Sequence, residues 1–505
     1  MFVWSAQEPD YQPVPGDVDE TVALKSRSGS IWHKSFRICG TGRSKWRRLL
    51  LRCLIFILGF NLLLLVLVPI FKPSYSKRPA HFSGKNIHGE KVFIAANIED
   101  EGLIRGAWRK SVFDLIDLLG PENVFLSIYE NDGGPGVKAA LEELSTLVKC
   151  RSHIISDHID RSKLPTVQFL PNDKRVKRIT YLAAARNYAI DPLVDFPLLN
   201  STIGPFSTPL TKFDKLLFLN DVVFSPKDAA DLLFSTNIGP DGRTRYDAAC
   251  AMDYVNPFKF YDRFALRDNE YYESGLPWYP WFTPGGSRAE SWHDVMQQKD
   301  AVRVKSCWGG MAAFEARWFA ESVRSVESAS MDSLSPLRFR SEEEVFWDAS
   351  ECCLIHADLQ DLVRRATGSA GNIFVNPYVR VAYNEATFKW LEFSRRFERL
   401  GFLSHVILGW LLGQPKASAR AAEVPGHQVA HAEWIYSDPP NLKPGEMFGV
   451  EDMSKFGTWK KVEKTATPGG YCGGPMLLAL RNPAPKKGEK YWEKINPVIP
   501  YVDFE

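Results

Sequence analysis

A single acid follows a short apolar run near the middle of the chain. In residues 212–224 (KFDKLLFLNDVVF), four apolar residues precede Asn220 and Asp221. A short apolar run bounded by charge predicts a buried strand, and open α/β sheets bind ligands at the carboxyl ends of their strands. Asp221 could hold a hard cation there through its carboxylate oxygens. An acid that merely caps the following turn explains the same residues equally well.

A similar group of polar residues ends an earlier apolar run. In residues 94–101 (IAANIEDE), Asn97, Glu99 and Asp100 follow the apolar residues. In a nucleotide-binding α/β domain, this position holds the base or the ribose. Acids at the start of a helix, where the helix dipole favours them, are the alternative interpretation.

Two further stretches combine residue types that suit a sugar nucleotide. Arg186 follows three alanines in residues 179–190, and small residues allow a ligand or another element to approach closely. Residues 307–311 (CWGGM) join the indole of Trp308 to Gly309 and Gly310, whose backbone amides could approach a ligand. A solvated arginine and a tight turn over the core are the simpler interpretations of these two stretches.

Acids recur before a predicted helix in residues 346–359 (FWDASECCLIHADL). Asp348 and Glu351 are three residues apart, and this spacing predicts a helix capped by Asp348 with Glu351 at its third position. Capping is compatible with acid–base chemistry, so the spacing does not separate the two roles. His356, on the same helix, is a further candidate metal ligand.

The elements that must position these residues alternate along the chain. Strands are expected at residues 91–97, 123–130, 153–156 and 212–224, and helices between them at 102–120, 137–148 and 179–190. Further strand-like stretches are residues 246–255 and 302–314. Alternation of this kind predicts βαβ units and an α/β fold with a mainly parallel sheet flanked by helices.

An apolar stretch precedes this domain. Residues 53–71 (CLIFILGFNLLLLVLVPIF) are long enough to span a bilayer. Seven Lys/Arg in residues 34–52 against five in residues 72–91 favour a cytosolic N-terminus, and the sequon at Asn200 agrees with a luminal remainder. The prediction is a type II membrane protein with a tail (1–52), an anchor (53–71), a stem (72–90), a domain (91–395) and a C-terminal extension of unassigned role (396–505).

The composition argues against nucleic-acid binding and against a structural zinc site. The net charge is +2, and no basic stretch with interleaved aromatic residues indicates nucleic-acid binding. The eight cysteines contain no CxxC pair, which argues against a structural zinc site. The six cysteines after the anchor could form one or more disulfides if that part is luminal, although Cys352 and Cys353 are not expected to bond each other.

Seven segments follow the anchor in a characteristic order: FIAANIEDEG, VFLSIYEND, RITYLAAARN, KLLFLNDVVF, YDAACAMD, SCWGGMAAF and WDASECCLIHADL. As an ordered set, over about residues 92–383, they resemble the fungal capsule-associated α-1,3-mannosyltransferases of the cryptococcal mannosyltransferase type. The resemblance implies a GT-A-like glycosyltransferase fold, GDP-mannose as donor, Mn²⁺ or another divalent cation, and a glycan acceptor. It also implies a secretory-pathway membrane such as the Golgi.

The resemblance suggests roles for the candidate residues. GT-A enzymes usually hold the metal with an Asp-x-Asp motif, and here the triplet is Leu219-Asn220-Asp221, so Asp221 would hold the metal and Asn220 the ribose. Arg186 would add positive charge near the phosphates. The remaining expected site residues are Asn97, Glu99, Trp308, Gly309 and Gly310 for the donor, Glu351 or Asp348 for the acceptor hydroxyl, and His356 as a further metal ligand.

Two other functions stay open at this point. The same fold could use another nucleotide sugar, such as a UDP-sugar. The protein could also be a non-catalytic partner in glycan synthesis, although the joint presence of Asp221, Arg186 and Glu351 argues against that.

Overall fold

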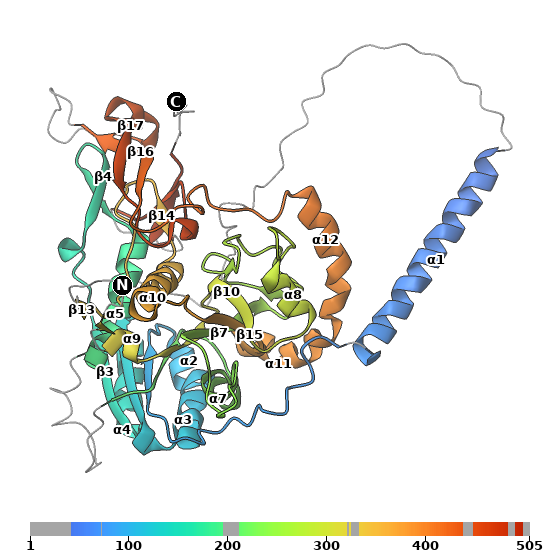
Figure 1. Ribbon diagram of the computed structural model, residues 1–505, viewed down its shortest axis with the longest axis horizontal. Coiled ribbons are helices and arrows are strands. Elements are labelled where there is room, and N and C mark those ends of the chain that lie inside the picture. The colour runs from blue at the N-terminus through green and yellow to red at the C-terminus, as the bar shows by residue number, and fades with distance from the viewer. Residues whose placement is uncertain are drawn as a thin grey trace.

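The fold is built on a mixed ten-stranded sheet (Figure 1). The computed structural model describes residues 42–71, 73–194, 212–320, 323–324, 333–437, 448–482 and 490–497. The strand order is β3 (Arg151–Asp157), β2 (Val124–Asn131), β1 (Val92–Ala96), β6 (Lys215–Leu219), β11 (Met311–Glu315), β7 (Ala248–Asn256), β15 (Ile373–Ala382), β10 (Val302–Ser306) and β9 (Arg267–Asp268), with β8 (Lys259–Phe260) paired to β7.

The directions of the strands create a crevice between β1 and β6. β1 pairs in parallel with both β2 and β6, and β7 pairs in parallel with β15. β11 runs antiparallel to both β6 and β7, so β6 and β7 point the same way. The chain proceeds from β1 to β2 and β3 on one side and then crosses to β6 on the other. Such a switch point leaves a crevice at the carboxyl ends of the two strands, where open α/β sheets bind ligands.

Helices cover both faces of the sheet. α3 (Ala107–Leu119), α4 (Gly134–Leu147) and α7 (Pro226–Ser235) pack on one face, and α5 (Arg178–Val194) and α10 (Glu351–Thr367) pack on the other. β1 explains the two layers, because alternate residues of a strand point to opposite faces: Ile94 joins the first cluster and Phe93 the second. The expected α/β fold with a mostly parallel sheet flanked by helices is confirmed.

The chain after residue 395 packs back onto the domain. After α11 (Glu385–Ser394) and η3 (Arg395–Leu400), α12 (Gly401–Leu411) leads to the hairpin of β16 (Gln428–Tyr436) and β17 (Gly457–Thr465). The other elements are α2 (Glu101–Arg105), α8 (Glu290–Met296), α9 (Arg317–Ala320), β4 (Thr166–Leu170), β5 (Asp173–Val176), β12 (Val323–Arg324), β13 (Ser333–Leu334), β14 (Asp348–Ala349), β18 (Gly473–Gly474), β19 (Leu477–Leu480), β20 (Trp492–Ile495), η1 (Pro121–Asn123), η2 (Arg161–Lys163), η4 (Val450–Lys455) and η5 (Gly470–Cys472). β18 pairs with β14, just before α10.

Two disulfides reinforce this arrangement. Cys250–Cys307 joins β7 to the segment after β10, and Cys353–Cys472 joins α10 to the C-terminal part. The expectation of disulfides beyond the apolar helix is confirmed, and Cys352 and Cys353 do not bond each other.

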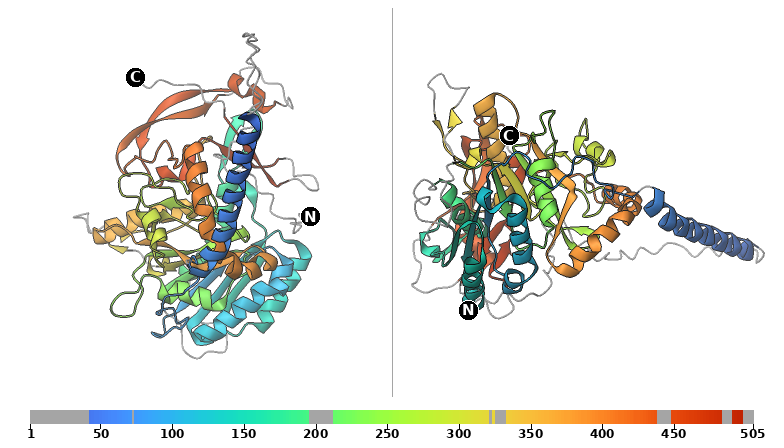
Figure 2. Two further views of the ribbon diagram at one scale, coloured as in Figure 1. Left: turned by 90° about the vertical axis from the view of Figure 1, so that its right-hand side faces the viewer. Right: turned by 90° about the horizontal axis from the view of Figure 1, so that it is seen from below.

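One helix is long and apolar enough to cross a membrane. α1 (Gly42–Phe71) contains the candidate span Trp46–Val68, whose side chains lie almost entirely exposed. Figure 2 shows α1 projecting away from the rest of the protein. This agrees with the predicted span at 53–71, whereas the sequon at residues 200–202 lies outside the described residues.

Asp348 does not cap α10, contrary to the prediction. The N-cap is Ser350, whose hydroxyl accepts a hydrogen bond from the Cys352 amide, so Glu351 is the first helical residue. Asp348 lies in β14, with no exposed surface, and its carboxylate is 2.7 Å from Lys177 Nζ. The Leu478 amide donates to its other oxygen. The geometry therefore assigns Asp348 to a buried ion pair and argues against the predicted catalytic role.

His356 is likewise part of the core rather than of a metal site. It is fully buried, and its Nδ1 donates to the Cys352 carbonyl at 2.7 Å. Its Nε2 lies 3.8 Å from Cys250 Sγ and 3.9 Å from Cys307 Sγ. These three residues could hold a metal by distance alone, but the two sulfurs bond each other and offer no thiolate. The predicted metal role of His356 is not supported.

We expect Asp348→Ala to lower the free energy of unfolding by about 3–5 kcal/mol, because the buried Lys177 ammonium loses its counter-charge. Denaturant unfolding measures the change. Asp114→Ala is the matched control, since Asp114 pairs with Lys110 at the surface, and it should cost at most about 1 kcal/mol. Loss of activity in Asp348→Ala with unchanged stability would contradict the structural role.

His356 should also give stability a specific pH dependence. Burial lowers the pKa of His356 from 6.5 to about 4, so between these values the unfolded chain binds the proton and the folded chain does not. Stability therefore rises with pH across this window, by at most about 1.4 kcal/mol per pH unit. The unfolding free energy of wild type minus that of His356→Phe should rise with pH from about 4 to about 6.5. A difference that is constant with pH would refute this.

Candidate active site

Polar residues from several strands meet at one edge of the sheet. Asn220 and Asp221 follow β6, Glu99 follows β1, Asp253 lies near the end of β7, and Tyr383 follows β15. Because these four strands run in the same direction, their carboxyl ends share that edge. β11 runs the other way, so the turn that leads into it returns to the same place. The edge of the sheet at the topological switch point therefore carries side chains that can hold a polar ligand.

Asn220 connects the parts of this site. Its side-chain oxygen accepts hydrogen bonds from Arg186 Nη1 and Trp308 Nε1, each at 3.2 Å. Its backbone amide donates to the Gly310 carbonyl at 2.9 Å, and its carbonyl accepts from Trp108 Nε1 at 3.1 Å. The side-chain oxygen thus positions Arg186 and Trp308, which speaks against the predicted ribose contact through that atom.

Arg186 is held on three sides. Its Nε donates to Glu351 Oε1 at 2.9 Å, its Nη1 donates to Asn220, and its guanidinium carbon lies 4.4 Å from the centre of the Trp308 ring. A planar guanidinium suits this combination, because it stacks on a ring and donates in a fixed fork. Arg186 lies on α5 and Glu351 is the first residue of α10, so their contact also joins the two helices that cover this face of the sheet.

The Gly309–Gly310 turn needs glycine at both positions. Their φ angles are +58° and +65°, and a Cβ on Gly309 would lie 2.0 Å from the Ala251 carbonyl oxygen. The Gly309 amide donates to Asp262 Oδ2 at 3.1 Å, and the adjacent Cys307 is bonded to Cys250 on β7. The turn is thus fixed against β7, and the Gly309 amide is bound to a carboxylate rather than offered to a ligand.

Four acids lie around this turn and the end of β6: Asp253 is fully buried, and Asp221, Glu99 and Asp262 are half-buried. Burial raises the pKa of Asp221, and the charge of Asp100 raises it further while Arg186 opposes the shift. Burial, followed by the charge of Asp221, raises the pKa of Glu99 to about 8. Burial also raises the pKa values of Asp253 and Asp262. The charge of Asp221 makes it harder for Glu99 to ionise, and the charge of Asp262 does the same to Asp253.

Such a set of oxygen donors suits a hard divalent cation. Carboxylate oxygens are the ligands that Mg²⁺ and Mn²⁺ prefer, and a bound cation would favour the charged forms that burial now disfavours. Asp221 and Glu99 are the acids whose charges act on each other at the crevice. A second group by distance, Glu344, His431 and Glu433, is instead an ion-pair network in which Arg420 and Lys464 bind Glu344.

The residues after β1 have structural duties as well. Asn97 Nδ2 donates to the carbonyls of Tyr129 and Ala185, at 2.9 and 3.0 Å, and so links β1 to β2 and α5. Asp100 caps α2 by accepting from the Leu103 amide at 2.8 Å. The helix-cap interpretation is confirmed for Asp100, whereas the donor contacts predicted for Asn97 and Glu99 stay predictions.

Sequence reasoning missed four residues of the site. Asp253 accepts from the Tyr383 hydroxyl at 2.7 Å and from the Asp262 amide at 3.0 Å, and Asp253 repeats the signal of Asp221, an acid near the end of an apolar strand. Asp262 and Tyr383 carried no such signal. Arg178 lies on the same helix as Arg186, with its charge near Glu351 and its guanidinium 5.1 Å from the centre of the Trp492 ring.

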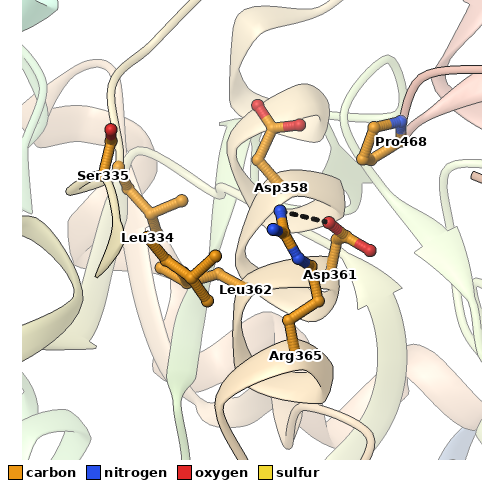
Figure 3. A pocket seen from close by; sticks show the side chains of 8 residues that line it. Leu334, Ser335, Asp358, Asp361, Leu362, Arg365 and Pro468 are labelled. Atoms are coloured by element: carbon orange, nitrogen blue, oxygen red, sulfur yellow. Dashed lines mark ion pairs between the residues drawn. The ribbon is translucent and has the colours of Figure 1, made fainter. Parts of the chain in front are cut away.

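A separate hollow lies along α10. Its volume is about 340 Å³, and its lining includes Asp358, Asp361 and Arg365 (Figure 3). Arg365 Nη1 lies 3.9 Å from Asp361 Oδ2, the contact that Figure 3 marks with a dashed line. The lining of this hollow does not include Asp221, Glu99, Asp253 or Asp262, so we assign the hollow no part in the candidate active site.

Comparison with known proteins identifies the family. A family model described as cryptococcal mannosyltransferase 1 matches residues 91–358, more than half of the chain, and this range contains Glu99, Arg186, Asp221, Trp308 and Glu351. No curated protein matches the chain.

Solved structures show only low similarity. The mannosyltransferase PcManGT from Pyrobaculum calidifontis, in complex with GDP-Man and Mn²⁺, is 10% identical with a TM-score of 0.31, over 67% of this chain and 68% of that one. Glucosyl-3-phosphoglycerate synthase from Mycobacterium tuberculosis, in complex with Mn²⁺, UDP and phosphoglyceric acid, is 12% identical with a TM-score of 0.29, over 79% and 95%. These scores are too low to transfer a ligand. The family match carries the assignment: the chain belongs to the cryptococcal mannosyltransferase 1 family and is a glycosyltransferase.

Proposed function

We propose that the protein moves mannose from GDP-mannose to a hydroxyl group of a glycan acceptor and forms an α-1,3 linkage. The site would be of the GT-A type, at the carboxyl ends of β1 and β6, and would need Mn²⁺ or another divalent cation. One observation carries this proposal. Arg186, clamped by Glu351, Asn220 and Trp308, acts on the charge of Asp221, which in turn acts on Glu99, so this edge of the sheet combines a candidate cation-binding carboxylate with a fixed positive charge.

Asp221 would hold the cation, with Glu99 as a second oxygen donor. When bound, the cation would offset the negative charge that builds on the departing nucleoside diphosphate. Metal binding at this place is consistent with the raised pKa values of both acids, because desolvation disfavours their charged forms and a bound cation would favour them.

Arg186 would face the phosphates as a second positive charge. Its position is set by the Glu351 carboxylate and by the Trp308 ring, so the side chain would lose little further conformational freedom when a phosphate binds. The Trp308 ring would form one wall of the sugar site. Within the described residues, Glu351 is the carboxylate that touches Arg186, so Glu351 positions the arginine whatever further role it has with the acceptor hydroxyl.

α1 and the disulfides support a proposal for the cellular setting. We propose that α1 anchors the protein as a type II membrane protein and that the domain lies in the lumen of a secretory compartment such as the Golgi. Two disulfides favour an oxidising compartment.

The first test is nucleotide binding by Asp221→Asn. With Mn²⁺, wild type should bind GDP-mannose, and the variant should bind it at least about 10-fold more weakly, because one metal ligand loses its charge. Calorimetry with GDP-mannose and UDP-glucose, each with Mn²⁺ and with EDTA, measures both donor choice and metal dependence. Asp114→Asn, at a surface ion pair, is the control. Equal Mn²⁺-dependent binding by Asp221→Asn and wild type would refute the metal assignment.

The second test is Arg186→Lys. Lysine keeps the charge but cannot donate to Glu351 and Asn220 and stack on Trp308 at the same time. We expect kcat/KM for mannose transfer to fall by about 10- to 1000-fold, mainly through kcat if Arg186 acts on the developing phosphate charge. Circular dichroism and thermal unfolding check that the variant folds. A folded Arg186→Lys with wild-type kcat/KM would remove Arg186 from the mechanism.

A further inference from the structure

The helix α12 buries a polar residue and a glycine and exposes its apolar residues. Its two buried positions are His405 and Gly409, four residues apart and therefore on one face. His405 Nδ1 donates to the Trp278 carbonyl at 3.1 Å, and its Nε2 lies 3.1 Å from the Thr283 hydroxyl. Polar contacts and a glycine thus face the protein, the reverse of the pattern that a helix on a water-soluble domain shows.

The opposite face of α12 is apolar and exposed. Leu403 is 66% exposed and Trp410 is 79% exposed, and the neighbouring exposed side chains are Val406, Ile407, Leu408, Leu411 and Leu412. α11 adds Trp390 and Phe393, which are 57% and 51% exposed and whose rings are 5.5 Å apart. We call this set of side chains on α11 and α12 the apolar ridge. Contiguous apolar patches of this kind mark interaction sites.

The position of α1 indicates what covers the ridge. Tyr75, four residues after the end of α1, is fully buried, and its carbonyl accepts a hydrogen bond from Arg395 Nη1 at 3.0 Å. Four residues of chain reach at most about 15 Å, so the end of α1 is tied to η3, which it contacts. η3 continues directly into α12. A bilayer that holds α1 therefore has its surface where α12 begins.

The figures agree with this placement. In Figure 1, α12 forms the edge of the domain that faces α1, and the left view of Figure 2 shows the two helices next to each other when seen from that side. Lys389 on α11, which pairs with the exposed Glu385, and Arg396 on η3 are exposed basic residues close in sequence to Trp390 and Phe393 of the ridge. Basic residues beside tryptophan and leucine side chains are typical of helices that lie at the interface between lipid headgroups and acyl chains.

We propose that the apolar ridge is a second membrane contact, in which α12 lies in the headgroup region of the same bilayer leaflet from which α1 emerges. This inference rests on the proposed anchoring by α1, and it is independent of the donor and the linkage. Its consequence is that the domain does not swing freely on its stem. The bilayer covers the leucine and tryptophan side chains of the ridge, which would otherwise face water.

Depth-dependent quenching in the full-length chain tests the proposal. The protein is placed in phosphatidylcholine vesicles with one cysteine labelled by an environment-sensitive fluorophore, and brominated lipids serve as quencher. Trp410→Cys and Ile407→Cys probe the ridge, in a background in which Cys39 and Cys53 are alanine. Leu147→Cys, an exposed apolar position on α4, is the matched control. The native Cys53, on α1 and exposed, reports anchor insertion when Cys39 alone is replaced.

We expect brominated lipid to quench the labels at residues 407, 410 and 53 by about twofold or more and to leave the label at 147 unchanged. Quenching at Cys53 without quenching at 407 and 410 would overturn the proposal, whether those labels report water or a covering protein. Absence of quenching at Cys53 would overturn it through its premise. Circular dichroism and thermal unfolding check that the Trp410→Cys and Ile407→Cys proteins fold, and GDP-mannose binding tests the proposed function separately.

Discussion

The contact between Arg186 and Glu351 is the interaction on which the active site depends. It places an ion pair where little solvent reaches, and desolvation of two such charges costs several kcal/mol unless further hydrogen bonds compensate. Asn220 and the Trp308 ring provide that compensation. The same contacts join α5, α10, the end of β6 and the glycine turn, so the arginine both needs and maintains the arrangement of these elements.

Around this ion pair the charges are unbalanced. Asp221, Glu99, Asp253 and Asp262 have raised pKa values mainly because desolvation disfavours their charged forms, and the charge of Asp221 adds to the shift of Glu99 as that of Asp262 adds to the shift of Asp253. Burial raises the pKa of Asp348 as well, but the Lys177 ammonium 2.7 Å away matches its charge, as is usual for a carboxylate that only stabilises a fold. The contrast separates the acids that hold the structure together from those that are available for a ligand, and perturbed acids in a crevice are typical of functional sites.

The C-terminal part of the chain stabilises this site through contacts with β14 and α10. Cys472 is bonded to Cys353 on α10, β18 pairs with β14, and the Leu478 amide binds Asp348. These contacts hold the start of α10, and therefore Glu351, from a part of the chain more than a hundred residues away. A segment that sequence reasoning left without a role thus fixes the orientation of a residue that holds Arg186.

The sequence by itself determined the α/β class, the strands that end in Glu99 and Asp221, the apolar helix near the N-terminus and the family, because these depend on local periodicity and on the order of short motifs. Only the tertiary structure decided which of the candidate site residues are committed to the core. Asp348 and His356 looked like Asp221 in sequence, but long-range partners, Lys177 for the one and the Cys250–Cys307 disulfide for the other, commit them to the core. Tertiary structure likewise turned Asn220 from an expected ligand contact into the link between Arg186 and Trp308. Hydrogen bonds between residues that are distant in sequence have no local pattern, so only the folded chain reveals them.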